Sequence, residues 1–233
     1  MAYNLKSSRI PPARRGKLRR GLPLAGGACM AASHYVIFAY APEEKLMGVI
    51  QKIFYLHLPL AWWALFSFFL VFLGSICYLK RPSAFWDALC EAAAETGLLM
   101  AFLALLTGAV WGRIAWNVWW IWDPRLSTTL ILCFIYAAYL LVRRLNFSCA
   151  RRGSISAVMG ILAFLDAPLV FFSTRLWPQT IHPDIIGKSE SLSGSMRIAL
   201  LFSLASLGIF WAALLDLRYR MDRLEHRLIR RNA

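Results

Sequence analysis

Six apolar runs, each close to the length that crosses a lipid bilayer, constrain this chain more than any other feature of its sequence. Because about 20 consecutive apolar residues in a helix span the hydrocarbon core, each run predicts one membrane-spanning helix. Hydrophobic residues make up 59% of the 233 residues, which excludes an ordinary soluble domain. We therefore predict an all-α integral membrane protein, a single membrane domain over residues 1–233, with six transmembrane helices at about 22–41, 58–79, 88–110, 127–142, 154–176 and 196–215.

The basic residues follow this predicted topology instead of forming one basic face. Of the 26 Lys and Arg residues, 19 lie in the two tails, 1–21 and 216–233, and in the loops on the same side of the membrane as the tails. The opposite side, which we call the outer side, carries the other 7. Because basic loops are retained in the cytoplasm, both termini are predicted to be cytoplasmic. The net charge of +14 then indicates contact with the anionic lipid of the bilayer, with no nucleic acid as a partner.

The second outer loop holds five of the ten tryptophans and ends on a carboxylate, Asp123. If residues 111–122 form a helix, 100° per residue places all five indole rings on one half of its surface. Tryptophan is common at the membrane–water boundary, so one interpretation is a lipid anchor. Flat aromatic faces also suit a planar ligand, and the density of the cluster favours this second interpretation. The five residues are Trp111, Trp116, Trp119, Trp120 and Trp122.

Two of the four histidines lie in the outer loops on either side of this cluster, His57 in the first and His182 in the third. Neutral imidazole is a common ligand of haem iron, so two such residues beside an aromatic floor predict a bis-histidine haem site. Zinc is the rival metal, but it normally takes three or four protein ligands, and no outer loop contains a cysteine. Of the other two histidines, His34 lies within the first predicted span and His226 in the basic tail.

Charged residues flank the tryptophan cluster. Asp123 followed by Pro124 is a strong helix start, and this capping role does not exclude a ligand contact. Arg113 and Arg125 border the cluster, and Arg175 lies at the end of the fifth predicted span. Each could pair with the propionates of haem through bidentate hydrogen bonds. Arg125 is unfavourable for the dipole of the helix that it begins, which hints at a ligand role.

These motifs together resemble the WWD superfamily of haem-handling membrane proteins, and within it the CcmC family, also called haem exporter protein C. The resemblance rests on Trp-Gly-x-x-x-Trp-x-x-Trp-Trp-x-Trp-Asp over residues 111–123, on Ile-Phe-Tyr-Leu-His-Leu-Pro over residues 53–59, and on His182. It implies non-covalent haem b at the periplasmic face of the bacterial inner membrane, with His57 and His182 as axial iron ligands and the tryptophan motif as the platform. It also implies partners: the haem chaperone CcmE, an ATP-binding-cassette complex of CcmA and CcmB, and the small membrane subunit CcmD. Such proteins resemble transfer factors of cytochrome c maturation rather than enzymes with turnover of their own.

Two other functions remain open at this point. A b-type haem subunit of a membrane redox enzyme normally carries pairs of histidines within its spans, and here only His34 lies within a span. A transporter permease would favour charged or broken helices at mid-membrane, for which the spans offer mainly residues 166–168 (Asp-Ala-Pro) and the pair Glu91 and Glu95. An ATPase is excluded within this chain, because the segment 187–189 (Gly-Lys-Ser) lacks the earlier glycine of a P-loop.

Overall fold

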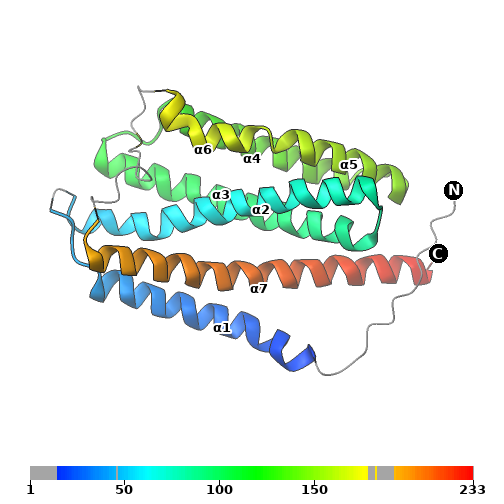
Figure 1. Cartoon of the computed structure of the whole chain (residues 1–233), viewed down its shortest axis with the longest axis horizontal. Helices are drawn as coiled ribbons and strands as arrows, with labels where there is room; N and C mark the ends of the chain where they lie inside the picture. Colours follow the sequence, from blue (N-terminus) through cyan, green and yellow to red (C-terminus); the bar gives the residue numbers. More distant parts are fainter. Residues whose placement is uncertain (1–14, 46, 178–181, 183–191, 233) are drawn as a thin grey trace.

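The structure is a computed structural model that describes residues 15–45, 47–177, 182 and 192–232. This part of the chain is almost entirely helical (Figure 1). A π-helical turn, Val36–Tyr40, extends the first helix, and a 3-10 turn, Val49–Ile53, precedes the second. The α-helices are α1 (Arg15–Tyr35), α2 (Phe54–Lys80), α3 (Ala84–Ala115), α4 (Pro124–Arg143), α5 (Cys149–Ala163), α6 (Asp166–Leu176) and α7 (Gly194–Asn232).

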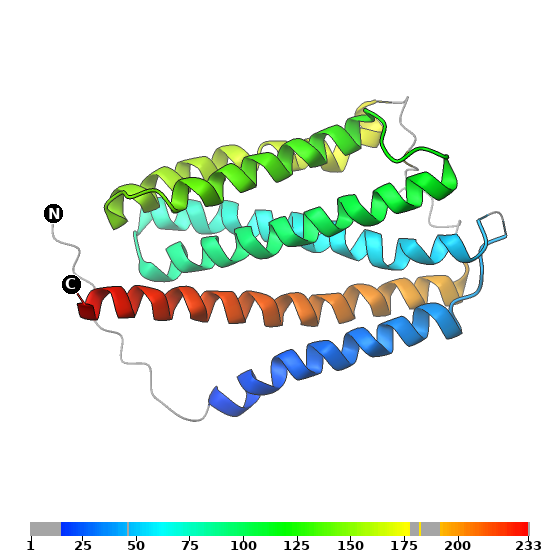
Figure 2. The ribbon, with the colours of Figure 1, turned by 180° about the vertical axis from the view of Figure 1, so that it is seen from behind.

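The helices form three layers, which the front and back views show alike (Figures 1 and 2). Helices α2 and α3 make up the middle layer. Helices α4, α5 and α6 lie on one side of it. Helix α7 lies on the other side, and α1 packs against the outer face of α7. Within the described residues, six helical segments are long and apolar enough to cross a membrane. The predicted fold, an all-α bundle of six transmembrane helices, is therefore confirmed. The six segments are Gly21–Tyr40, Val49–Lys80, Ala84–Ala115, Pro124–Arg143, Cys149–Leu176 and Gly194–Leu224.

The fifth segment is broken, although the sequence predicts one continuous helix over 154–176. Helix α5 ends at Ala163 and α6 begins at Asp166. Pro168 explains the break, because proline has no N–H to donate to the carbonyl four residues earlier and its ring crowds that carbonyl. This is the carbonyl of Phe164, which instead accepts a hydrogen bond from the backbone N of Ala167 at 3.1 Å. The result is a separate half-helix, α6, that forms one wall of the site described below.

The core lies where α2, α3, α4 and α7 meet. Helices in membranes pack closely where small residues let their backbones approach. Gly97 of α3 is such a position, since a Cβ there would lie 2.8 Å from the ring of Phe68 on α2. Phe68 is fully buried and stacks on Tyr136 of α4, with 3.8 Å between the ring centroids and 15° between the ring planes. These contacts hold the middle layer and α4 in a fixed relation.

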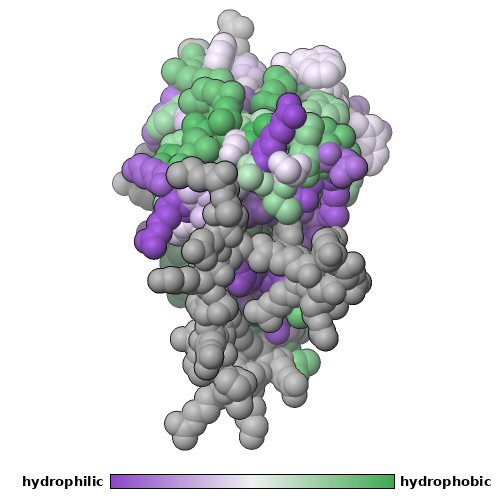
Figure 3. Space-filling view, turned by 90° about the vertical axis from the view of Figure 1, so that its right-hand side faces the viewer, coloured by the Kyte–Doolittle hydropathy of each residue, from purple (hydrophilic) through white to green (hydrophobic). Residues whose placement is uncertain are grey.

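Helix α1 begins and α7 ends at the same end of the bundle, which we call the tail end; the opposite end is the site end (Figure 1). A view onto the tail end shows hydrophilic side chains among apolar ones (Figure 3). A buried ion-pair cluster also lies there, centred on Arg143 of α4, whose side chain is 2% exposed. One guanidinium nitrogen donates to Asp87 Oδ1 at 2.9 Å and to Glu91 Oε2 at 2.8 Å. This cluster ties α4 to α3 at the end of the bundle farthest from the site.

Candidate functional site

The tryptophan segment is not one helix over 111–122, so the predicted half-cylinder of indole rings is wrong. Helix α3 ends at Ala115, and residues 116–123 are irregular. The chain turns at Asn117, whose φ of 58° lies in the left-handed region that glycine and asparagine adopt most readily. The guanidinium of Arg113 secures this turn by donating to the backbone oxygen of Asn117 at 2.9 Å and to its side-chain oxygen. Trp111 therefore lies on the last turns of α3, Trp116 is the C-cap residue directly after the helix, and the other three tryptophans lie on the loop that follows.

A cleft at the site end lies between the middle layer and the layer of α4 and α6. It encloses about 1180 Å³ of empty space, counting the part that is open to the outside. Six residues that the sequence singles out line the cleft together: His57, Trp111, Trp116, Arg125, Arg175 and His182.

His57 lies in the first turns of α2 and presents its ring to the cleft. Its Nδ1 lies 3.0 Å from the carbonyl oxygen of Ala104 and 3.1 Å from Thr107 Oγ1, both on α3. Because a carbonyl oxygen only accepts, Nδ1 carries the hydrogen and Nε2 keeps its lone pair. Gly108 makes this approach possible, since a Cβ at that position would lie 3.1 Å from His57 Cε1. A hydrogen-bonded Nδ1–H is the usual device that orients an imidazole for metal binding through Nε2.

Asp123 links the tryptophan loop, α4 and His182. Its side chain is 1% exposed and accepts a hydrogen bond from the backbone N of Arg125 at 2.9 Å, as the predicted N-cap of α4. The same oxygen, Oδ1, lies 3.2 Å from His182 Nδ1. Because a carboxylate only accepts, Nδ1 of His182 is also the donor, and its Nε2 also keeps a lone pair. One carboxylate therefore both starts a helix and orients a histidine.

The surroundings of His182 favour the neutral form of its ring. Burial lowers its pKa below the ordinary value of 6.5, and the positive charge of Arg125 lowers the pKa further, whereas the Asp123 carboxylate opposes both effects. The contact between His182 and Asp123 is therefore a hydrogen bond rather than an ion pair of a charged imidazolium. Neutral imidazole is also the form that a metal ion binds.

Aromatic rings connect the two histidines along the wall of the cleft. The ring of Trp111 lies 5.9 Å from that of His57 and 6.2 Å from that of Trp116, centroid to centroid. The ring of Trp116 in turn lies 6.2 Å from that of His182. Trp111 Nε1 is buried and has no hydrogen-bond partner among the described residues.

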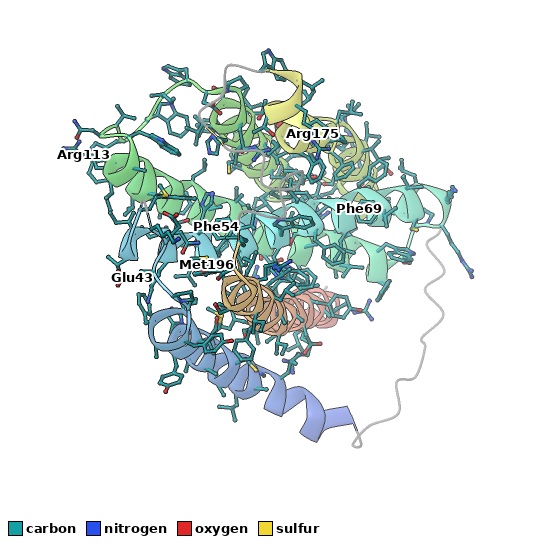
Figure 4. All side chains as sticks on the ribbon, turned by 60° about the vertical axis from the view of Figure 1, so that its left-hand side comes forward. Glu43, Phe54, Phe69, Arg113, Arg175 and Met196 are labelled. Atoms are coloured by element: carbon teal, nitrogen blue, oxygen red, sulfur yellow. The ribbon has the colours of Figure 1, made fainter. Side chains whose placement is uncertain are left out.

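Two arginines make the remaining side of the cleft cationic. Arg125 donates to Ser173 Oγ at 3.1 Å, to Thr174 Oγ1 at 3.0 Å and to the carbonyl oxygen of Phe171 at 3.3 Å. It therefore joins α4 to α6 across the cleft wall. Arg175, near the end of α6, also lines the cleft (Figure 4). The two guanidinium groups can bind carboxylates of a ligand at the site end.

The other predicted site residues lie outside the lining of the cleft. Trp119 and Trp122 are 62% and 78% exposed, and Trp120 packs edge-on against Trp122 at 5.8 Å between ring centroids. Arg113 projects at the edge of the bundle, beside the turn that it secures (Figure 4). Asp123 acts through His182 and does not line the cleft itself.

Sequence reasoning missed several residues on which the site depends. Thr107 and Gly108 position His57, while Trp62 and Phe171 line the cleft on α2 and α6. The spacing of Gly108 one turn before Trp111 on the same helix is a signal that could have found it. Trp62 reads from the sequence as an ordinary interfacial tryptophan, and Phe171 as one apolar residue among many.

The donor set of the cleft fits a planar iron macrocycle better than a bare metal ion. Within the described ranges, no group of three or more His, Cys, Asp or Glu side chains is arranged to hold a metal. The cleft instead offers two imidazole Nε2 atoms, and haem iron takes its axial ligands in this way while the ring supplies the others. The two arginines match the carboxylate edge of such a ligand.

Fold and cleft together define a class: a multi-span membrane protein with a bis-imidazole, tryptophan-lined cleft at one end of its bundle. Comparison with known protein families then identifies the family. Residues 12–233 match the family CcmC, described as heme exporter protein C. The chain belongs to the heme exporter protein C family, as its motifs predict.

Relatives from several bacteria carry the same description. The heme exporter protein C of Paracoccus denitrificans is 28% identical over 208 residues, which cover 88% of this chain and 86% of the relative. That of Rhodobacter capsulatus is 30% identical over 191 residues, with coverage of 79% and 78%. That of Escherichia coli K12 is 27% identical over 187 residues, with coverage of 78% and 74%. The similarity therefore extends over most of both chains in each case.

Proposed function

We propose that this protein binds haem in the cleft at its site end and serves haem export for cytochrome c maturation. The observation that carries the proposal is that two imidazole rings at the cleft have the same hydrogen-bond arrangement. His57 and His182 each donate from Nδ1 to a fixed acceptor, so each keeps a lone pair on Nε2 at the same cleft. Membership of the heme exporter protein C family supports the same function.

The remaining lining residues have defined roles in this proposal. The rings of Trp111 and Trp116 supply the aromatic wall against which a flat haem b, held without a covalent bond, packs. Arg125 and Arg175 pair with its two propionates by charge-assisted hydrogen bonds. The assignment of Trp119, Trp120, Trp122 and Arg113 as haem contacts stays a prediction for the loaded protein, and Asp123 acts by orienting His182.

The location and partners of the protein follow from the same proposal. The excess of basic residues on the tail side supports cytoplasmic termini, and with them a cleft at the periplasmic face of the inner membrane. From there the haem passes to the chaperone CcmE, with CcmA and CcmB supplying nucleotide chemistry and CcmD completing the membrane complex. The names of the bacterial relatives support export of haem, and the partners are those of the family that the motifs resemble.

The test is the absorbance spectrum of the purified protein, recorded for the wild type and for variants that lack one of the two proposed axial histidines. We expect a low-spin, bis-histidine spectrum of haem that acid–acetone extraction removes. His57→Ala and His182→Ala should each disturb this spectrum while the protein stays in the membrane. His34→Ala is the matched control, because His34 is exposed on α1 and its Nδ1 bonds only within its own helix, to the Met30 carbonyl at 2.8 Å. An unchanged spectrum in both cleft variants would overturn the axial assignment.

A further inference from the structure

The cleft does not stay at the end of the bundle but descends into its membrane-spanning part. Its lining follows one face of α2 from His57 through Ala61 to Leu65. Eight residues of helix correspond to about 12 Å, so the floor of the cleft lies well inside the outer half of the bilayer. The residues at this depth are apolar, whereas Arg125 and Arg175 lie nearer the site end. The cleft therefore resembles one leaflet of a bilayer, with charged groups at its outer end and apolar groups at its floor.

The walls of the cleft differ in how they are closed. Helix packing closes the sides between α2 and α3, between α3 and α4, and between α4 and α6. On the side between α2 and α6, two aromatic side chains meet: the rings of Trp62 and Phe171 lie 6.3 Å apart at 90°. Side chains can rotate away without separating helices, so this side is the easiest to open.

These two side chains also face the surroundings of the bundle. Trp62 lines the cleft and is nevertheless 45% exposed on a membrane-spanning helix. Phe171 lines it as well and is half-buried. Because each ring lines the cleft from a membrane-spanning segment and is partly exposed, we infer that one of its faces lies toward the cleft and the other toward lipid. The pair thus separates the interior of the cleft from the hydrocarbon of the outer leaflet by the thickness of one layer of rings.

We propose that the cleft takes up its ligand sideways from the outer leaflet of the bilayer, through a portal between α2 and α6 that Trp62 and Phe171 cover. The ligand class is a planar amphipath with a large apolar ring system and carboxylates at one edge. Such a molecule dissolves in a leaflet with its ring among the acyl chains and its carboxylates at the headgroups. In that orientation its ring is level with Ala61 and Leu65, and its carboxylates are level with the two arginines. The proposal rests on the proposed function, since it takes haem as the ligand.

The test measures how fast haemin dissolved in phosphatidylcholine vesicles reaches the full-length protein reconstituted in the same lipid. Stopped-flow absorbance follows the appearance of the bis-histidine spectrum. Trp62→Ala and Phe171→Ala each remove one half of the ring pair, so the association rate should rise about fivefold. Phe134→Ala is the matched control, because Phe134 is 66% exposed on α4 and does not line the cleft, and its rate should equal that of the wild type.

A second probe separates the membrane route from an aqueous one. An iron porphyrin with four sulfonate groups does not dissolve in hydrocarbon, so it should bind slowly and at a rate that Trp62→Ala leaves unchanged. If Trp62→Ala fails to fold, Ala61→Leu tests the portal in the opposite sense, by narrowing it and slowing haemin uptake. Wild-type haemin rates in the portal variants, or sulfonated porphyrin that binds as fast as haemin, would overturn the proposal. Failure of the proposed function looks different, because the wild type then develops no haem spectrum at any time.

Discussion

Replacing Asp123 with asparagine separates the two roles that its carboxylate combines. Asparagine caps a helix about as well as aspartate, so Asp123→Asn should leave α4 in place and change stability by less than about 0.5 kcal/mol. The amide, however, lacks the negative charge that receives the Nδ1 hydrogen of His182 at 3.2 Å. We therefore expect Asp123→Asn to weaken haem binding while the protein stays folded in the membrane.

The size of the effect follows from the geometry of that contact. A hydrogen bond to a charged group contributes about 1.5–3 kcal/mol, and a separation of 3.2 Å is at the long end of the normal range, which favours the lower value. A loss of about 1.5 kcal/mol corresponds to roughly tenfold in the dissociation constant. Partners that orient metal-binding histidines typically contribute about 10- to 100-fold to metal affinity, so the expected loss lies at the lower end of that range.

The assay is a titration of the haem-free protein with haemin, read at the Soret band, together with thermal unfolding of each variant. Asp123→Ala is the comparison that also loses the cap, so it should lose about 1 kcal/mol of stability in addition. In a protein that already carries His182→Ala, Asp123→Asn should cause no further loss of affinity, because the two residues act as one unit.

The pH dependence provides the refuting result. The Asp123 carboxylate raises the pKa of His182, so removing its charge lowers that pKa further, and His182 stays neutral between pH 7 and 8 in both proteins. The affinity loss should therefore be the same at pH 7 and pH 8. A loss that disappears at pH 8, or a dissociation constant equal to that of the wild type at both values, would refute the orienting role of Asp123.

Three further substitutions test the packing around the site and at the tail end. Gly108→Ala places a methyl group 3.1 Å from His57 Cε1, so it should displace that ring at a cost of about 1–3 kcal/mol in haem binding, measured by the same titration. Arg125→Lys cannot make the forked contacts between α4 and α6, and should lower the free energy of unfolding by about 1–3 kcal/mol in a denaturant titration. Arg143→Met leaves the partly buried carboxylates of Asp87 and Glu91 without this cation and should cost about 3 kcal/mol. Arg144→Met is its control, since Arg144 is 60% exposed and should contribute about 1 kcal/mol or less; equal losses in the two variants would contradict the assignment.

The six spans could be predicted because hydropathy reports directly on which segments can lie in lipid. The exact ends of the helices could not be predicted, because a helix continues through polar residues once it has formed. Helix α3 runs over Ala84–Ala115 where 88–110 is predicted, and α7 continues to Asn232 where the span is predicted to end at 215. The break in the fifth span had a visible signal in Pro168, but apolar composition alone does not show whether a proline kinks a helix or ends it.

The site could be predicted as a set of residue types, and less well as a geometry. His57, His182, Trp111 and Trp116 line one cleft, as the pattern indicates. The helical assumption for the tryptophan segment failed because a periodic arrangement says nothing about a single turn residue such as Asn117, which takes the chain off the helix. The contact of Gly108 with His57 joins two helices, and although the spacing of Gly108 from Trp111 marks the residue, neither segment alone shows which side chain it faces.

The length of helix α7 has a consequence for the tail end of the bundle. Its 39 residues form one rod of about 58 Å, and the hydrocarbon core accounts for about 30 Å of that length. The final turns therefore project from the membrane as a rigid spacer. Their length sets the distance from the membrane of any molecule that binds to them. One residue inserted into this rod moves its tip by about 1.5 Å and swings it through about 100°, so its length also determines the direction in which it points.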